Sequence, residues 1–358
     1  MAKVHNFSAG PGILPKEVLQ KAADAVLNFD NLDLSLLEIS HRSKNFENVM
    51  DNVRALVLEL MELSSDKYEV LFLQGGASMQ FYMAPLNLLS LNGKAAYINT
   101  GEWATRAIKE VKKIGNVEVC ASSEDAHFSY IPKDFSIPAD IDFLHYTSNN
   151  TIYGTQYHHI PETESTLVCD MSSDIFSRPT DFSKFGLIYA GAQKNMGPAG
   201  TTLVVVKKEL LGKTGRELPT MLDYQVHIKG GSMYNTPAVF PIYVSYLTLQ
   251  WLKNNGGLEN IGKINDAKQS LFYGEVDRNP LFKGTAKKED RSWMNATFVL
   301  EKPELDEHFA AMIKDANISQ LKGHRSVGGY RASMYNALPL ESVEVLVQVM
   351  KEFEAKFG

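Results

Sequence analysis

The chain has 358 residues, of which 44% are hydrophobic and 22% charged, and its formal net charge is −6 at pH 7. This charge argues against a nucleic-acid binder, which normally presents a basic face, and no run approaches the roughly 18 apolar residues of a membrane span. The N-terminus lacks the apolar core of a secretion signal. The only cysteines, Cys120 and Cys169, lie far apart and outside any metal spacing. We therefore expect a cytoplasmic globular protein with one large and one small domain, which binds neither nucleic acid nor membrane.

Helical and strand-like segments alternate through the first two hundred residues. The apolar spacing predicts helices over 16–28, 46–61, 79–89 and 103–113. Strands are expected over 68–73, 94–99, 116–121, 143–146, 166–169 and 187–190, and a further β-branched run covers 201–206. This alternation is typical of an α/β fold with a mainly parallel sheet whose faces are covered by helices. Ligand-binding groups then belong at the carboxyl ends of the strands.

The pattern changes from about Tyr243. Helices are expected over 243–253, 258–273, 303–315 and 339–356, with only two strands between them, 294–300 and 330–334. This mixture of helices and few strands predicts a small α+β domain, and we expect the irregular N-terminal arm to pack beside it. We therefore expect a large domain of residues 16–255 and a small domain made of residues 1–15 and 256–358.

Lys194 lies in a glycine-punctuated loop between two apolar strands. Burial disfavours the ammonium form, so a lysine in this position can be a free amine suited to imine chemistry. Taken alone, a surface lysine in a hairpin loop is the more common alternative. Lys194 stands out because Gly76, Thr151 and Asp170 also lie just beyond the ends of predicted strands.

The segment Gly75-Gly76-Ala77-Ser78 separates a strand from a helix. A helix N-terminus offers unpaired N–H groups and a partial positive charge, which stabilise a phosphate. The segment is neither a Walker A loop nor GxGxxG, so it does not indicate a nucleotide, and an ordinary turn is the alternative.

Asp170 follows the strand over 166–169 and is a carboxylate in an apolar setting that needs a cationic partner. A protonated pyridine nitrogen would serve, whereas the alternative is a helix-capping or turn aspartate. Trp103 opens a helix after Gly101, where its indole can stack on a flat ring or simply pack in the core. Thr151 and Gln193 are polar groups at strand ends and are ordinary by themselves.

Two His-Arg pairs supply cations for an acidic substrate, His41-Arg42 and His324-Arg325, and Arg331 lies on a predicted strand. Arginine suits bidentate recognition of carboxylate or phosphate. The histidines lack a spacing such as HExxH, so no metal site is expected.

Together these segments resemble the phosphoserine aminotransferases, in the fold-type I, class V group of pyridoxal-phosphate enzymes. The likeness spans nearly the whole chain. It is carried by the stretches 7–12, 39–43, 189–195, 234–237, 323–325 and 329–337. The resemblance implies a seven-stranded sheet in the large domain and one pyridoxal 5'-phosphate per subunit, bound as a Schiff base on Lys194.

The resemblance also implies roles for individual residues. Asp170 would pair with the pyridinium nitrogen, Trp103 would stack on the ring, and Thr151 would bond near the ring oxygen. The cofactor phosphate would be held by Gly76, Ala77 and Gln193, and by Asn235 and Thr236 of a neighbouring subunit, which implies a homodimer. The substrates would be bound by Ser8, His41, Arg42, His324, Arg325 and Arg331. Some family members have arginine where this chain has Ala77, which leaves the contacts to the substrate phosphate open.

The implied reaction moves the amino group of L-glutamate to 3-phosphohydroxypyruvate and gives O-phospho-L-serine and 2-oxoglutarate. Amination of 4-phosphohydroxy-L-threonine for pyridoxine synthesis is a further activity of some members that the residues do not decide.

A cysteine desulfurase is disfavoured because neither cysteine lies on a mobile loop. An alanine–glyoxylate transaminase would not need two His-Arg pairs. A nucleotide-binding module lacks its motifs, and a cofactor-free binding protein would be colourless.

Overall fold

The computed structural model describes residues 3–358 and has a central seven-stranded sheet. Its strands follow the order β2-β10-β9-β8-β5-β3-β4, and β10 alone runs antiparallel to its neighbours. The predicted mainly parallel α/β sheet is confirmed. The strands are β2 (Tyr68–Leu73), β3 (Lys94–Asn99), β4 (Asn116–Ser122), β5 (Phe143–Thr147), β8 (Thr166–Asp170), β9 (Leu187–Gly191) and β10 (Thr202–Lys207).

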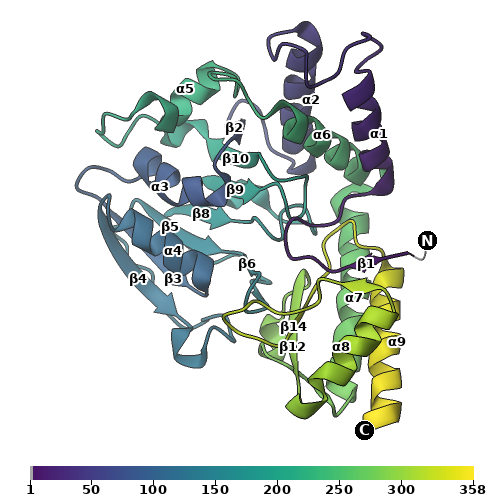
Figure 1. Ribbon diagram of the computed structural model, residues 1–358. Helices are drawn as coiled ribbons and strands as arrows, with labels where there is room; N and C mark the ends of the chain where they lie inside the picture. The colour runs from purple at the N-terminus through teal and green to yellow at the C-terminus, as the bar shows by residue number, and fades with distance from the viewer. Residues whose placement is uncertain (1–2) are drawn as a thin grey trace.

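Helices cover both faces of this sheet (Figure 1). One face packs against α3 (Gly76–Leu88), α4 (Glu102–Val111) and α5 (Tyr224–Lys229). The other packs against α2 (Lys44–Leu60) and α6 (Val239–Asn254), with α1 (Lys16–Leu27) lying against α6. Because both faces are covered, β5 and β9 are buried along their whole length instead of alternating between buried and exposed residues.

The C-terminal part is a smaller α+β unit. Its antiparallel sheet has the order β11-β12-β14. Phenylalanines fill its core, where Phe282, Phe309 and Phe353 lie with ring centroids 5.0–5.9 Å apart. Its elements are α7 (Gly257–Arg278), β11 (Phe282–Gly284), β12 (Asn295–Leu300), α8 (Asp306–Asp315), β14 (Tyr330–Ser333) and α9 (Leu340–Phe357).

Two features tie the units together. Helix α7 packs Ile261 into the core of the large sheet and Phe272 into the C-terminal core. The N-terminal arm also joins the two units. It precedes α1 of the large unit in the chain, but its Phe7 is fully buried in the C-terminal core. Beside it, β1 (His5–Asn6) pairs in parallel with β13 (Ile318–Ser319).

Several expected boundaries were wrong. Helix α3 begins at Gly76 rather than residue 79, because Gly75 and Gly76 adopt φ values of +94° and +65° and turn directly into the helix. Helix α7 continues to Arg278 instead of ending at 273, since Val276 still faces the core. Helix α6 begins at Val239, four residues before the predicted start. The unpredicted elements are α5, β1, β11, β13 and the hairpin of β6 (Asn149–Asn150) with β7 (Thr155–Gln156).

None of the helices within residues 3–358 has both the length and the apolar character needed to cross a membrane. Over the same residues, no group of three or more His, Cys, Asp and Glu side chains is arranged to hold a metal ion.

Candidate active site

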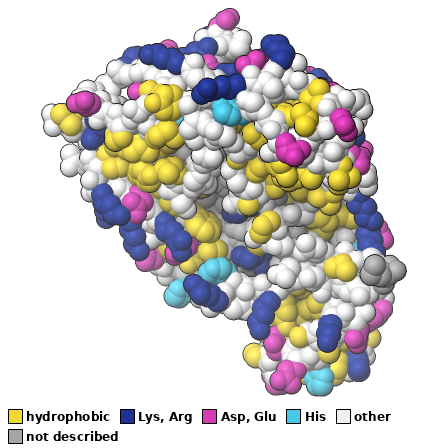
Figure 2. Space-filling view, turned by 45° about the horizontal axis from the view of Figure 1, so that its top comes forward, with side chains coloured by type: hydrophobic (Ala, Val, Ile, Leu, Met, Phe, Trp, Pro, Cys, Tyr) yellow, Lys and Arg dark blue, Asp and Glu magenta, His cyan; other side chains and the backbone are white. Residues whose placement is uncertain are grey.

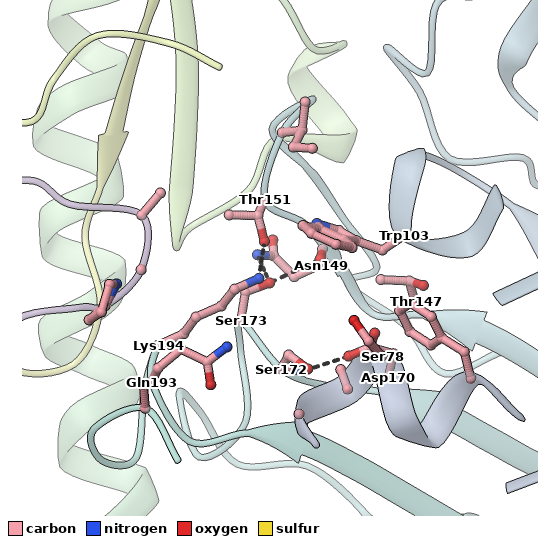
Figure 3. A pocket seen from close by; sticks show the side chains of 18 of the residues that line it. Ser78, Trp103, Thr147, Asn149, Thr151, Asp170, Ser172, Ser173, Gln193 and Lys194 are labelled. Atoms are coloured by element: carbon pink, nitrogen blue, oxygen red, sulfur yellow. Dashed lines mark hydrogen bonds between the residues drawn. The ribbon is translucent and has the colours of Figure 1, made fainter. Parts of the chain in front are cut away.

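A cavity of about 650 Å³ opens at the carboxyl ends of the parallel strands. The N-terminal arm, the start of α3 and the C-terminal unit contribute its other walls (Figure 3). Nine of the fifteen predicted site residues line it. They are Gly76, Ala77, Trp103, Thr151, Asp170, Gln193, Lys194, His324 and Arg331.

Lys194 extends from the loop between β9 and β10 into the cavity (Figure 3). Its Nζ donates to Oγ1 of Thr151 at 2.8 Å and lies 5.5 Å from the centroid of the Trp103 ring. Removal from water lowers the pKa of Lys194 to about 8, and the nearby Asp170 carboxylate only partly offsets this. An appreciable share of the amine is therefore unprotonated near neutral pH, as a nucleophile or base requires.

Asp170 is the last residue of β8 and is 4% exposed. The backbone N–H of Ser172 donates to its Oδ1 at 2.9 Å (Figure 3). Ser148 donates to the backbone carbonyl of Asp170 through both its N–H and its Oγ. Burial raises the pKa of Asp170, while Ser172 and Lys194 oppose the rise. A buried carboxylate held in this way is stabilised by a cation placed beside it in the cavity.

The N-terminus of α3 faces the cavity through Gly76, Ala77 and Ser78. The first hydrogen bond along the helix runs from the Met79 amide to the Gly75 carbonyl, at 3.3 Å. The amides of the three residues before Met79 therefore have no acceptor within the helix, and no side chain caps them. A Cβ built on Gly76 meets nothing within 4 Å, so the space beside this residue is open. The arrangement suits a phosphate group.

Trp103 forms the opposite wall from the first turn of α4. Its Nε1 is buried without a hydrogen-bond partner, and the Arg106 guanidinium lies 5.0 Å from its ring centroid. Asp170, Trp103, Lys194 and the α3 N-terminus thus surround one space with a carboxylate, a flat ring, an amine and a phosphate cradle. These four groups match the pyridine nitrogen, ring, aldehyde and phosphate of pyridoxal phosphate, so the residues present fit this cofactor.

Arg331 brings positive charge, and His324 brings an imidazole, to the side of the cavity formed by the C-terminal unit. Arg331 lies on β14, and its Nη1 donates to the carbonyl of Thr151 at 3.2 Å. Burial lowers the pKa of His324, and the charges of Arg331 and Arg325 lower it further. A substrate anion would offset this crowding of positive charge.

The other six predicted residues do not line the cavity within one protomer. They are Ser8, His41, Arg42, Asn235, Thr236 and Arg325. Asn235 donates to the exposed Gln74, and Gln74 in turn donates to the carbonyl of Thr236. This pair therefore lies beside the α3 cradle without reaching the cavity. His41 is partly buried, and its Nε2 has no partner.

Sequence reasoning missed several wall residues, among them Asn149, Ser172 and Ser173. Asn149 is 2% exposed and donates through Nδ2 to Ser173 Oγ and Asn295 Oδ1, both at 2.8 Å. All three follow the carboxyl ends of β5 and β8, which is the only signal that could have singled them out.

The family comparison agrees with this geometry. The model of the class-V aminotransferase family matches residues 4–346, and the chain belongs to this family.

Among its relatives, the phosphoserine aminotransferase of Flavobacterium johnsoniae is 64% identical over 99% of both chains, and that of Porphyromonas gingivalis is 57% identical over the same share. The solved structure of phosphoserine aminotransferase from Bacillus circulans subsp. alkalophilus has a TM-score of 0.96 at 44% identity, over 99% of both chains. The PLP-bound enzyme from Trichomonas vaginalis has a TM-score of 0.92 at 34% identity, over 98% of this chain and 100% of the other.

Proposed function

We propose that this chain is a phosphoserine aminotransferase that uses pyridoxal 5'-phosphate to move the amino group of L-glutamate reversibly to 3-phosphohydroxypyruvate. The observation that carries the proposal is Lys194, a buried lysine with a pKa of about 8 that donates to Thr151, in a cavity that also holds the Asp170 carboxylate and a phosphate cradle. Full-length relatives named for this activity support the choice of substrates.

When bound, pyridoxal phosphate supplies a carbonyl carbon for the amine and a pyridinium ring that takes up electron density as a proton leaves the substrate Cα. Lys194 would hold the cofactor and then, once freed, move the proton at that carbon as general base and acid. Asp170 would keep the ring nitrogen protonated, because a buried carboxylate stabilises an adjacent cation. Trp103 would fix the plane of the ring and exclude water from one face.

The positive groups would orient the substrates. We assign Arg331 to the substrate carboxylate, because its guanidinium lies in the cavity and is fixed by Thr151. His324 lines the cavity and Arg325 is exposed next to it, so a small movement of their loop would bring both to the substrate phosphate. Ala77 supplies no cation at the cradle, which leaves this task to the His-Arg pairs.

We also propose a homodimer, in which Asn235 and Thr236 of one subunit reach the cofactor phosphate of the other and Arg42, His41 and Ser8 complete the substrate site. The leucines and tyrosine near these segments have unusually exposed side chains: Leu34 is 49%, Leu37 61% and Tyr234 49% exposed. In the view of Figure 2, hydrophobic side chains gather on both sides of a hollow in the surface. Their burial in a second subunit would remove apolar area from water.

We also propose a large domain of residues 16–255 and a small domain of residues 1–15 with 256–358, which carries Arg331. The two separate hydrophobic cores support this division, although Ile261 at the start of α7 packs into the large core. Cys120 and Cys169 are both free thiols, which agrees with a reducing, cytoplasmic location.

The visible absorption spectrum of the purified protein tests the function. We expect a yellow band that fades when L-glutamate is added and returns with 3-phosphohydroxypyruvate, with 2-oxoglutarate and O-phosphoserine appearing in equal amounts. If the band fades with L-glutamate but does not return with 3-phosphohydroxypyruvate, the protein is a transaminase that uses a different amino-group acceptor. No band after incubation with pyridoxal phosphate would reject the proposal.

A further inference from the structure

Lys268 is a fully buried lysine that the proposed reaction does not use. It lies on α7, and its side chain has no exposed area. Its Nζ donates to three backbone carbonyl oxygens, those of Met334 at 3.0 Å, Tyr335 at 2.8 Å and Leu338 at 3.2 Å. An ammonium group has three N–H donors, so each of them has one acceptor.

This arrangement is costly. Burial lowers the pKa of Lys268 to about 7, and a charge taken out of water without an opposite charge destabilises a fold. All three acceptors lie within residues 334–338, the segment that leaves β14. The ammonium therefore acts on one short stretch of backbone, whose conformation it determines.

That stretch contacts the loop of the proposed catalytic lysine. The Asn336 amide donates to Oδ1 of Asn195 at 2.9 Å, and Asn195 directly follows Lys194. Asn195 is held from its other side by the carbonyl of Ile175, to which its Nδ2 donates at 2.6 Å. Asn336 itself donates to the carbonyl of Phe176 at 2.8 Å. Segment 334–338 thus determines where the backbone after Lys194 lies.

The same stretch also contacts the N-terminal arm, which forms another wall of the cavity. The Tyr335 hydroxyl donates to the carbonyl of Ala9 at 2.7 Å. Gly12 packs between the Tyr335 ring and the Lys194 carbonyl, where an added Cβ would come within 2.9 Å of one and 2.5 Å of the other. The Gly12 amide donates to the Gln193 carbonyl at 2.7 Å. Arm, segment and lysine loop therefore pack as one unit.

We infer that Lys268 is a positioning residue for the transamination: by holding segment 334–338 it sets the position of the Lys194 loop and of the N-terminal arm. Arg331 lies just upstream of this segment but is held independently. Arg331 pairs with Thr297 on the neighbouring strand β12, and its Nη1 donates a hydrogen bond to the Thr151 carbonyl. The inference rests on the proposed function for its kinetic consequence, whereas the structural consequence is independent of it.

The first test uses hydrogen exchange on the full-length protein without cofactor. In Lys268→Met, three carbonyls lose their donor, and we expect the amides of Gly12 and Asn336 to exchange roughly tenfold faster or more, as in local opening. Lys268→Gln keeps two N–H donors and should lie between Met and wild type. Lys263→Met removes an exposed lysine from the same helix and serves as the matched control. Strand β8 should exchange at the wild-type rate in every variant, which shows that the large core is intact.

The second test measures kinetics of the loaded enzyme. Lys268→Met removes a buried ammonium group and its three hydrogen bonds, so we expect kcat to fall roughly tenfold. The KM for L-glutamate should change little, because Arg331 keeps its contacts. If Lys268→Met does not fold, Lys268→Gln decides both measurements. A lower melting temperature with unchanged exchange at Gly12 and Asn336 and unchanged kcat would overturn the inference, since Lys268 would then serve stability alone. If the wild type fails to transaminate, the proposed function fails, and the exchange result still decides whether Lys268 positions the Lys194 loop.

Discussion

The Nζ atom of Lys194 lies 2.8 Å from the Oγ1 atom of Thr151, although 43 residues separate them in the chain. Lys194 lies beyond the carboxyl end of β9, and Thr151 lies beyond the carboxyl end of β5. Because these strands run parallel, both residues lie at the same end of the sheet. The hydroxyl accepts a hydrogen bond from the amine, and the Thr151 carbonyl accepts one from Arg331. One residue thus contacts both the proposed base and the proposed substrate cation.

Replacing Thr151 with valine should lower kcat. The change keeps the shape of the side chain but removes the acceptor of Lys194, and hydrogen bonds to charged groups contribute about 1.5–3 kcal/mol, so the expected loss is roughly 10- to 100-fold. Thr151→Ser keeps the hydroxyl and should stay near wild type. Steady-state kinetics would contradict the assignment if valine and serine behaved alike.

Asp170→Asn should leave a cavity of the same shape with no negative charge. We expect kcat to fall by roughly two to three orders of magnitude, the range for loss of one preorganised electrostatic contact, while pyridoxal phosphate still binds through the α3 cradle. Cofactor content by absorbance and turnover of both substrates are the measurements. Unchanged turnover would remove Asp170 from its proposed role.

The amine of Lys194 should titrate near pH 8 in the protein without cofactor. Its reactivity toward acetic anhydride, followed by peptide mass spectrometry against pH with the exposed Lys184 as internal reference, should rise through about pH 8, because burial lowers its pKa from the ordinary 10.5. The Asp170 carboxylate raises this pKa, so Asp170→Asn should move the midpoint to lower pH. A midpoint near 10.5 would show that Lys194 is not held in the buried setting described.

Arg331→Lys should weaken binding of both substrates. Lysine cannot reproduce the planar two-point contact to a carboxylate, and the expected rise in KM is roughly 10-fold or more for L-glutamate and for 3-phosphohydroxypyruvate alike. Arg325→Ala is the matched comparison, because it should raise KM only for the phosphorylated acceptor. Equal effects of Arg325→Ala on both substrates would place Arg325 outside the phosphate site.

Mixing two inactive variants decides which subunit supplies Arg42. Lys194→Ala and Arg42→Ala should each be nearly inactive. If Arg42 serves the neighbouring site, mixed dimers regain one complete site, and random exchange gives about a quarter of wild-type activity. A mixture of Lys194→Ala and Asp170→Asn, both in the same cavity, should regain none. Recovery in neither mixture would assign Arg42 to its own subunit.

Much of the fold could be predicted because it depends on periodic apolar spacing. The alternation of helices and strands through residue 206 predicted the parallel sheet, and the parallel sheet predicted that Gly76, Asp170 and Lys194 meet at one edge. The two-residue strands β1 and β13 could not be predicted, since they have no period and exist only because Phe7 is buried in a distant core. Helix α5 has only six residues, too few to show a helical period, and it depends on Tyr224 packing against one face of the sheet.

The site was predictable only where local sequence carries the chemistry. A glycine pair before a helix and a lysine in a glycine-rich loop are visible along the chain, whereas the bonds of Asn149 to Ser173 and Asn295 arise from three separate segments. Lys268 gave no signal either, because a lysine on a helix is normally exposed. The residues expected from a second subunit, such as Asn235, lie outside the cavity of one protomer, and a single chain does not bring them together.

The packing of Phe7 has a consequence for the order of events during synthesis. Translation runs from the N-terminus, so the arm that carries Phe7, Ala9 and Gly10 leaves the ribosome well before the core that receives it, which is made from residues 272–353. The arm must wait, unpaired, until almost the whole chain has been made. Since Ala9 and Gly10 form one wall of the cavity, the amine of Lys194 is enclosed only after residues 272–353 have folded around Phe7.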